Sequence, residues 1–271
     1  MRSLFWLLLA ASLASMTGCG DSNGDYLTED RKAKGLVVIL PGIEGESPLN
    51  HDIRLGLVQG GADCAMPIYS WGRPVPGLGV LLNQVDFIGN RLAGIRIANM
   101  IAQYQDAYPD RPVYVVGHSG GGGVAVFTAE AMADLPGDRK IDGLVLLSAS
   151  ISAGYDLSKA AGRCKSGIVN FYNKGDVGLL GVGTIVAGNV DGGHGPSAGF
   201  IGFDKIRPSD PDKKKEAFTK VYQVVVTEDM SSGDPHASTT RPGFVSQFVA
   251  RWVTSQSWPA GTAEVAYQAE Q

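Results

Sequence analysis

The sequence predicts an α/β fold in which a mostly parallel sheet of about six strands is flanked by helices. Short apolar runs bounded by turn residues recur along the chain, which is typical of strands that are buried on both faces. Stretches with helical spacing of apolar residues lie between these runs, and this alternation favours βαβ units with right-handed crossovers. The composition, with 44% hydrophobic and 18% charged residues among 271, is sufficient for one large folded core.

The individual elements follow from the same patterns. The segments with the character of buried strands are 35–41, 63–71, 112–118, 141–148, 167–173 and 221–227. The helical patterns cover 85–108, 120–135 and 241–255. The connection 177–220 is long for a link between strands, and its beginning is apolar and rich in glycine. We expect it to form either a packed helix followed by a surface loop or a lid over a site.

The first eighteen residues resemble an export signal. Arg2 supplies a positive start, and residues 4–14 form an apolar run that is shorter than the ~20 residues of a membrane-spanning helix. The residues before Cys19 (Met-Thr-Gly) resemble the cleavage box of bacterial lipoproteins, in which that cysteine receives the lipid. We therefore expect a lipid anchor at Cys19 that holds the protein at the cell envelope. Plain secretion and an uncleaved anchor are the alternatives.

This interpretation divides the chain into segments. Residues 1–18 are the expected signal peptide, 19–34 a polar tether, 35–258 the folded domain and 259–271 a C-terminal tail. The 23 Lys+Arg against 27 Asp+Glu, with no basic run beyond 213–215, argue against a nucleic-acid partner.

The pattern G-x-S-x-G occurs three times, around Ser22, Ser119 and Ser197. The chain contains 37 glycines, so the pattern alone is weak evidence. Only Ser119 lies between a predicted strand and a predicted helix, which is the context in which a sharp turn exposes a nucleophilic serine. The other elbow positions are Gly117, His118 and Gly121, and the glycines there allow a close approach of backbones.

A serine hydroxyl becomes a useful nucleophile when a base takes its proton and a carboxylate orients that base. Two of the four histidines follow the nucleophile, and we favour His236, because its loop after the last strand reaches the carboxyl edge of the sheet. His194, in the long connection, is the alternative. Asp176, in the turn after strand 167–173, is the favoured acid, with Asp156 as its competitor.

Two backbone N–H groups are expected to form an oxyanion hole. One belongs to Gly120, at the start of the helix whose positive end points to the site. The other is assigned to Ile43, in the loop 40–45 (LPGIEG) after the first strand. The alternative for this loop is a Pro-Gly turn that only ends the strand. Glu44 would lie near the site, and its charge is expected to disfavour anionic acyl groups.

The order Ser119, Asp176, His236, each after a predicted strand, resembles the α/β-hydrolase superfamily over residues 35 to about 258. The resemblance implies a serine hydrolase that takes the acyl group of a small-molecule or lipid-like ester onto its serine, without metal or organic cofactor. Little chain precedes Gly35, so the first two strands of the family are expected to be missing or vestigial. The elbow GHSGG is similar to that of lipases and esterases, but thioesterases and peptidases share it, and the fold does not decide the substrate.

The same fold separates Cys64 and Cys164. It places them near the starts of strands four positions apart, about 19 Å at ~4.8 Å per strand, whereas a disulfide needs Cα atoms ~4.4–6.8 Å apart. We therefore expect two free, buried thiols.

A second class of function stays open. A lipoprotein with this fold can be catalytically inactive and bind a ligand or partner instead. The three filled positions of nucleophile, acid and base favour an enzyme.

Overall fold

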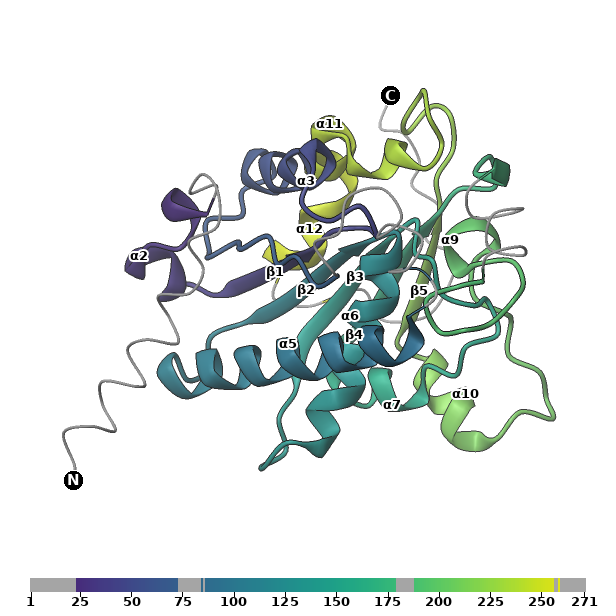
Figure 1. Cartoon of the computed structure of the whole chain (residues 1–271), viewed down its shortest axis with the longest axis horizontal. Coiled ribbons are helices and arrows are strands. Elements are labelled where there is room, and N and C mark those ends of the chain that lie inside the picture. The colour runs from purple at the N-terminus through teal and green to yellow at the C-terminus, as the bar shows by residue number, and fades with distance from the viewer. Residues whose placement is uncertain (1–22, 73–83, 85, 179–187, 256–257, 259–271) are drawn as a thin grey trace.

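The computed structural model describes residues 23–72, 84, 86–178, 188–255 and 258. Its centre is a sheet of five parallel strands, and their order in the sheet is their order in the chain (Figure 1). The strands are β1 (Leu36–Leu40), β2 (Val113–His118), β3 (Ile141–Leu147), β4 (Cys164–Tyr172) and β5 (Val221–Val225). Each forms close to its predicted position, because a continuous apolar run can be buried on both faces of a parallel sheet.

One of the six predicted strands, 63–71, is not a regular strand. Ala65 and Ile68 make isolated parallel bridges to Leu36 and Ile39, outside β1 at the edge of the sheet. Pro67 accepts a hydrogen bond from the Ile39 N–H through its carbonyl but has no N–H to return to a ladder. The prediction of about six strands is therefore corrected to five, with an irregular edge segment in the place of the sixth.

The helices fill the connections between the strands. The longer ones are α3 (Pro48–Gln59), α5 (Phe87–Ala107), α6 (Gly120–Ala131) and α10 (Asp212–Phe218). The single helix expected over 241–255 is divided into three pieces. The remaining elements are η2 (Gly24–Tyr26), α2 (Glu29–Lys32), η3 (Met132–Asp134), α7 (Ser158–Ala161), α9 (Ala198–Ile201), η5 (Ala237–Thr240), α11 (Pro242–Phe244), the π-helical η6 (Val245–Val249) and α12 (Arg251–Thr254).

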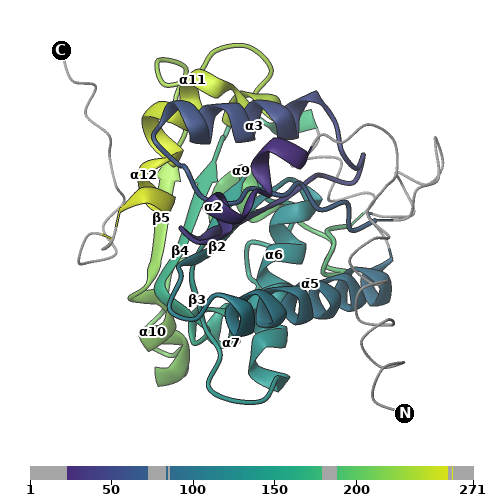
Figure 2. The same cartoon turned by 90° about the vertical axis from the view of Figure 1, so that its left-hand side faces the viewer.

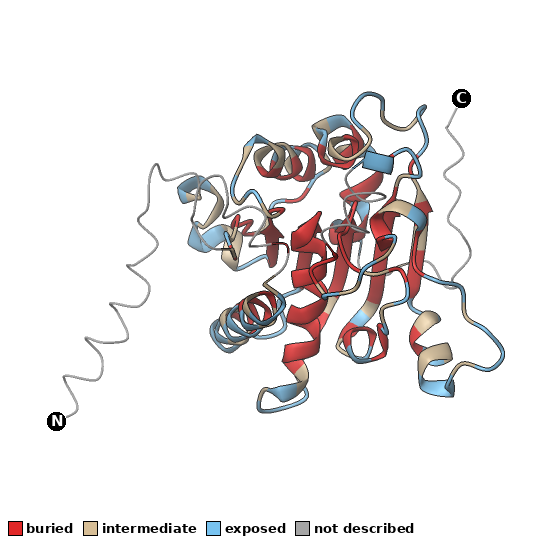
Figure 3. Ribbon diagram, turned by 45° about the vertical axis from the view of Figure 1, so that its right-hand side comes forward, coloured by how far each residue is buried: buried red, intermediate tan, exposed pale blue. Residues whose placement is uncertain are grey.

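Helices cover both faces of the sheet. α3, α11 and α12 lie on one face, and α5, α6 and α7 lie on the other (Figure 2). Alternate residues of β1 divide between the two cores, with Val38 in one and Val37 in the other. Figure 3 colours the buried parts of the fold red, and the strands of the sheet are among them. All twelve residues of α6 are buried, so this helix lies deep in its layer. The elbow at its N-terminus is thereby built on a rigid support.

The beginning of the described chain differs from the expected tether. Residues 23–34 pack along the irregular edge segment, where the Ala65 N–H donates to the Arg31 carbonyl and the Met66 N–H donates to the Tyr26 carbonyl. The side-chain oxygen of Asn23 accepts from the Ile68 N–H at 3.1 Å. The segment therefore covers the open edge of the sheet, which would otherwise expose unpaired backbone groups.

Both cysteines of the folded domain are free thiols. Cys164 is buried as expected, whereas Cys64 is half-buried. Desolvation raises the pKa of the Cys64 thiol to about 11. The apolar start of the long connection, 179–187, lies outside the described residues, as do the signal, Cys19 and Ser22. In the described ranges no helix is long and apolar enough to span a membrane.

Candidate active site

Ser119 sits on a strained turn between β2 and α6. Its φ and ψ are 52° and −123°, a conformation that costs free energy for a residue other than glycine. The surrounding backbone holds it there, because the Ser119 N–H donates to the Leu147 carbonyl and the Ser119 carbonyl accepts from the Ser150 N–H. Ser119 is 8% exposed. The strand–turn–helix context predicted from the sequence is thus present.

The elbow glycines lie where a side chain has no room. A Cβ added at Gly117 would lie 2.4 Å from the carbonyl oxygen of Gly121. A Cβ added at Gly121 would lie 2.3 Å from the carbonyl oxygens of both Leu40 and Pro41. The elbow and the end of β1 therefore touch backbone to backbone, and this contact requires glycine.

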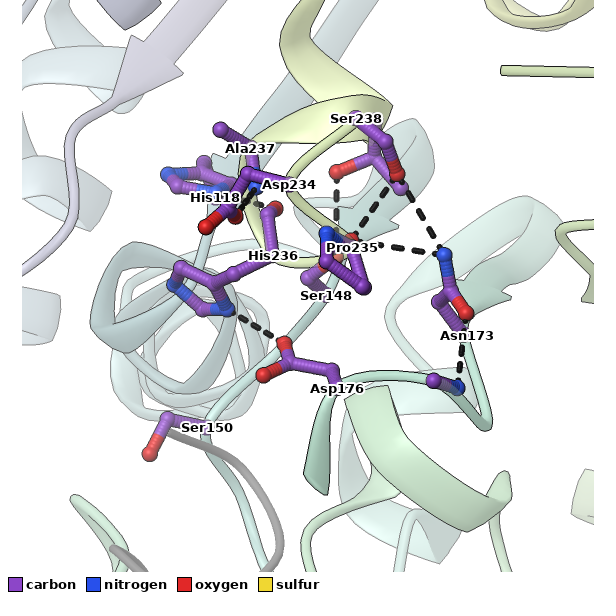
Figure 4. Close-up of polar contacts among 12 residues, drawn as sticks. His118, Ser148, Ser150, Asn173, Asp176, Asp234, Pro235, His236, Ala237 and Ser238 are labelled. Atoms are coloured by element: carbon purple, nitrogen blue, oxygen red, sulfur yellow. Dashed lines mark hydrogen bonds and ion pairs between the residues drawn. The ribbon is translucent and has the colours of Figure 1, made fainter. Parts of the chain in front are cut away.

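Asp176 and His236 contact each other through their side chains. Nδ1 of His236 lies 2.6 Å from Oδ2 of Asp176, and both side chains are largely buried (Figure 4). An ionised carboxylate only accepts hydrogen bonds, so beside it the neutral imidazole carries its proton on Nδ1 and has a lone pair on Nε2. That lone pair is what a general base needs. Among the described residues there is no hydrogen bond between Ser119 and the His236 ring.

The loop after β1 lies against the elbow. A Cβ added at Gly120 would lie 2.7 Å from Cγ2 of Ile43, so the two residues whose N–H groups were assigned to the oxyanion hole are neighbours. The indole Nε1 of Trp71 donates to the Pro41 carbonyl at 2.7 Å and braces the loop from the edge segment. Sequence reasoning missed Trp71, although its position at the end of a predicted strand next to the first one was a usable signal.

Glu44 folds back over its own loop. Its carboxylate lies over Gly42, where an added Cβ would be 2.2 Å from Oε2, and the Ser47 hydroxyl donates to Oε1 at 3.4 Å.

The alternative candidates for acid, base and nucleophile make contacts away from the Asp176–His236 pair. Asp156 accepts hydrogen bonds from the N–H and the hydroxyl of Ser158 at the start of α7, and the Ser158 hydroxyl lowers the pKa of that carboxyl. Both contacts are local, within two residues of Asp156. The His194 ring lies against Gly188 within the long connection. Ser197 is buried, precedes α9 and has an unstrained φ of −83°, so it is not on an elbow.

His118, the elbow residue before Ser119, has a strongly lowered pKa. It is buried, and desolvation, with the charge of the neighbouring His236 as the second cause, lowers the pKa of His118 to about 3. The two rings lie 4.9 Å apart between centroids. His118 is therefore neutral at physiological pH. In the part of the chain that the structure describes, no group of three or more His, Cys, Asp or Glu side chains is arranged to hold a metal ion.

Comparison with known proteins gives structural similarity only. No family model and no curated protein matches the chain. Among solved structures, a cutinase-like protein from Cryptococcus sp. is 14% identical, with 81% of this chain and 92% of that chain covered at a TM-score of 0.40. The monoacylglycerol lipase of Paleococcus ferrophilus is 19% identical over 71% and 73% of the two chains, with a TM-score of 0.32.

A third similar structure is the NocB thioesterase domain in covalent complex with a fluorophosphonate nocardicin G analog. It is 13% identical, covers 77% of this chain and 92% of that chain, and has a TM-score of 0.38. At these values the similarities carry no argument of their own. The order of the parallel strands, the elbow after β2 and the helices on both faces are the chain's own evidence. These features define an α/β fold that carries a strained serine on the turn between its second strand and the following helix.

Proposed function

We propose that this protein is a serine hydrolase that cleaves a carboxylic ester or thioester through an acyl-enzyme on Ser119. The observation that carries the proposal is the 2.6 Å contact between His236 Nδ1 and Asp176, at the same sheet edge as a serine held at positive φ. Acyl transfer requires a buried carboxylate that orients an imidazole and a serine that the imidazole can reach, and both parts are present at this sheet edge.

The first half of the reaction acylates the serine. His236 Nε2 takes the proton of the Ser119 hydroxyl as Oγ attacks the carbonyl carbon of the substrate. Negative charge develops on the carbonyl oxygen, where the N–H groups of Gly120 and Ile43 would stabilise it. His236 then gives its proton to the leaving alcohol or thiol, and the C–O or C–S bond breaks.

The second half releases the acid. His236 takes a proton from water, and the hydroxide oxygen attacks the acyl carbon. The tetrahedral intermediate collapses, Ser119 Oγ recovers its proton from His236, and the carboxylic acid leaves. Asp176 holds the ring throughout and stabilises its protonated form. Every proton is carried by His236, so this reaction needs no other base.

Turnover of a series of p-nitrophenyl esters by purified protein tests this proposal. We expect Ser119→Ala and His236→Ala each to lower kcat by ~10⁴-fold or more, while circular dichroism and the melting temperature show a folded protein. His194→Ala is the matched control, and it should keep wild-type activity. Loss of activity in His194→Ala with full activity in His236→Ala would refute the assignment of the base.

The alternative, a binding protein with this fold, makes the opposite prediction for the same series. The absence of a Ser119–His236 hydrogen bond among the described residues is the observation that keeps it in view. No turnover of any ester or thioester by folded protein would favour it.

We also propose that the protein is lipid-anchored at Cys19 and faces an envelope membrane, where acyl esters are available. The support is the sequence alone, through the apolar run 4–14 and the residues before Cys19. Metabolic labelling with a fatty-acid analogue tests it. Label is expected on the wild-type protein and not on Cys19→Ser, and equal label on both would refute the anchor.

A further inference from the structure

The loop that carries His236, residues 234–240, is held by three side chains from neighbouring strands. His118 ends β2, Ser148 follows β3 and Asn173 follows β4. These strands are adjacent in the sheet, so the three residues follow one another along its carboxyl edge. Figure 4 shows them around residues 234–238 of the loop. We call them the strand-end anchors.

His118 makes the contact nearest to the proposed base. Its Nε2 lies 3.3 Å from the main-chain carbonyl oxygen of His236, and a carbonyl only accepts, so Nε2 carries the proton. His118 is 1% exposed and directly precedes Ser119. The His118 side chain therefore ties the backbone of His236 to the elbow that carries Ser119.

The protonation state of His118 suits this position. With Nε2 protonated and the ring neutral, Nδ1 has no proton, and it has no hydrogen-bond partner in the described structure. A charged ring at a centroid distance of 4.9 Å would oppose the imidazolium that forms on His236 during catalysis. Burial keeps the pKa of His118 low and removes this opposition.

The other two anchors hold the residues on either side of His236. Ser148 Oγ and Thr239 Oγ1 lie 3.0 Å apart, both buried, and Ser148 has a φ of 45°, a strained conformation for serine. Asn173 Nδ2 lies 3.4 Å from the Pro235 carbonyl, and Asn173 Oδ1 accepts from the Gly175 N–H at 2.8 Å. Asn173 therefore connects the base loop with the turn that carries Asp176.

We propose that the strand-end anchors are positioning residues that hold His236 in register with both Asp176 and Ser119, and that His118 makes the decisive contact. The inference rests on the proposed function and deepens it. The physical reason is that His236 lies on a long loop after β5, whereas Ser119 directly follows β2 and Asp176 lies in the short turn after β4. Without a tie to the strand ends, motion of the loop would move Nε2 relative to Ser119, and a displacement of about 1 Å can lower the rate by ~100-fold.

Two substitutions of one residue separate positioning from packing. His118→Gln places an amide N–H where Nε2 stood, whereas His118→Leu fills the space without a donor. We expect His118→Leu to lower kcat about 10- to 100-fold with KM within about threefold, and His118→Gln to stay within about fivefold of wild-type kcat. The matched control is His51→Gln on α3, whose partly exposed ring contacts Glu46 and Arg54. It should leave kcat unchanged.

Proton NMR can report directly on the contact between His236 and Asp176. The Nδ1 proton of His236, shared with Asp176, should give a low-field resonance in the proton NMR spectrum. We expect this resonance to persist in His118→Gln and to broaden or disappear in folded His118→Leu. Retention of both the resonance and kcat in His118→Leu would overturn the proposal.

The remaining outcomes are also decided. If His118→Leu fails to fold, Ser148→Ala and Asn173→Ala replace it, and unchanged kcat in both overturns the proposal. Ser119→Ala is measured in parallel. If that variant keeps full turnover, the proposed function fails, and this result is distinct from a failure of the anchors, in which Ser119→Ala is inactive while the anchor variants are fully active.

Discussion

The substitution Gly121→Ala places a methyl group into the contact between the elbow and the loop after β1. The added Cβ would lie 2.3 Å from the carbonyl oxygens of Leu40 and Pro41, whereas a relaxed C···O contact is about 3.3 Å. The two backbones must therefore separate by about 1 Å. Overpacking of this kind costs about 1–3 kcal/mol, which corresponds to a fall in melting temperature of about 2–12 °C for a domain of this size.

The same displacement moves the loop that carries Ile43 away from Ser119. We expect kcat/KM for p-nitrophenyl esters to fall by about 100-fold, because the oxyanion donors and the nucleophile no longer share one geometry. Gly243→Ala in α11 is the matched control, since an added Cβ there meets nothing within 4 Å. Its activity and melting temperature should stay at wild type or rise slightly. Folded Gly121→Ala with activity within threefold of wild type would refute the close contact as a requirement of the site.

Three further predictions concern the acid, the buried histidine and the cysteines. Asp176→Asn should lower kcat by about 10³–10⁴-fold, because an amide can hold His236 in the wrong tautomer, and a kcat within tenfold of wild type would contradict its role. The folded pKa of His118, about 3, lies below its unfolded value near 6.5. The unfolded chain therefore binds the extra proton between these values, and the free energy of unfolding should fall as the pH is lowered through that window. Urea titrations should show a flatter pH dependence for His118→Gln, and equal slopes would argue against a neutral His118. Alkylation of denatured, unreduced protein should modify both Cys64 and Cys164, and a disulfide-linked peptide would contradict their free state.

The sequence predicted the strands well because each contains a mostly apolar run, and burial on both faces needs little else. It failed at segment 63–71, where Pro67 interrupts the ladder although the residues around it are apolar. It also failed for residues 23–34, whose polar composition is typical of a tether. Their docking depends on backbone groups of the edge segment, such as the Ala65 N–H, and a linear pattern does not reveal these partners.

The candidate site was predictable where a residue type and its place after a strand coincide. Ser119, Asp176 and His236 each follow a strand, so the topology of a parallel sheet brings them to one edge. The strand-end anchors follow strands too, but Ser148 and Asn173 are common residues in turns. Their contacts with the His236 loop depend on the path of residues 228–240, which sequence periodicity does not describe. The sequence placed His118 in the elbow, but its contact with the main-chain carbonyl of His236 was not predictable, because every residue has such a carbonyl.

An activated serine is the central claim of this account, and reaction with a fluorophosphonate probe followed by peptide mass spectrometry tests it most directly. We predict one adduct on Ser119 of the folded protein, absent from Ser119→Ala and strongly reduced in His236→Ala. Labelling of Ser119 that is equally fast in wild type and His236→Ala, or an adduct on another serine with Ser119 unmodified, would contradict the account.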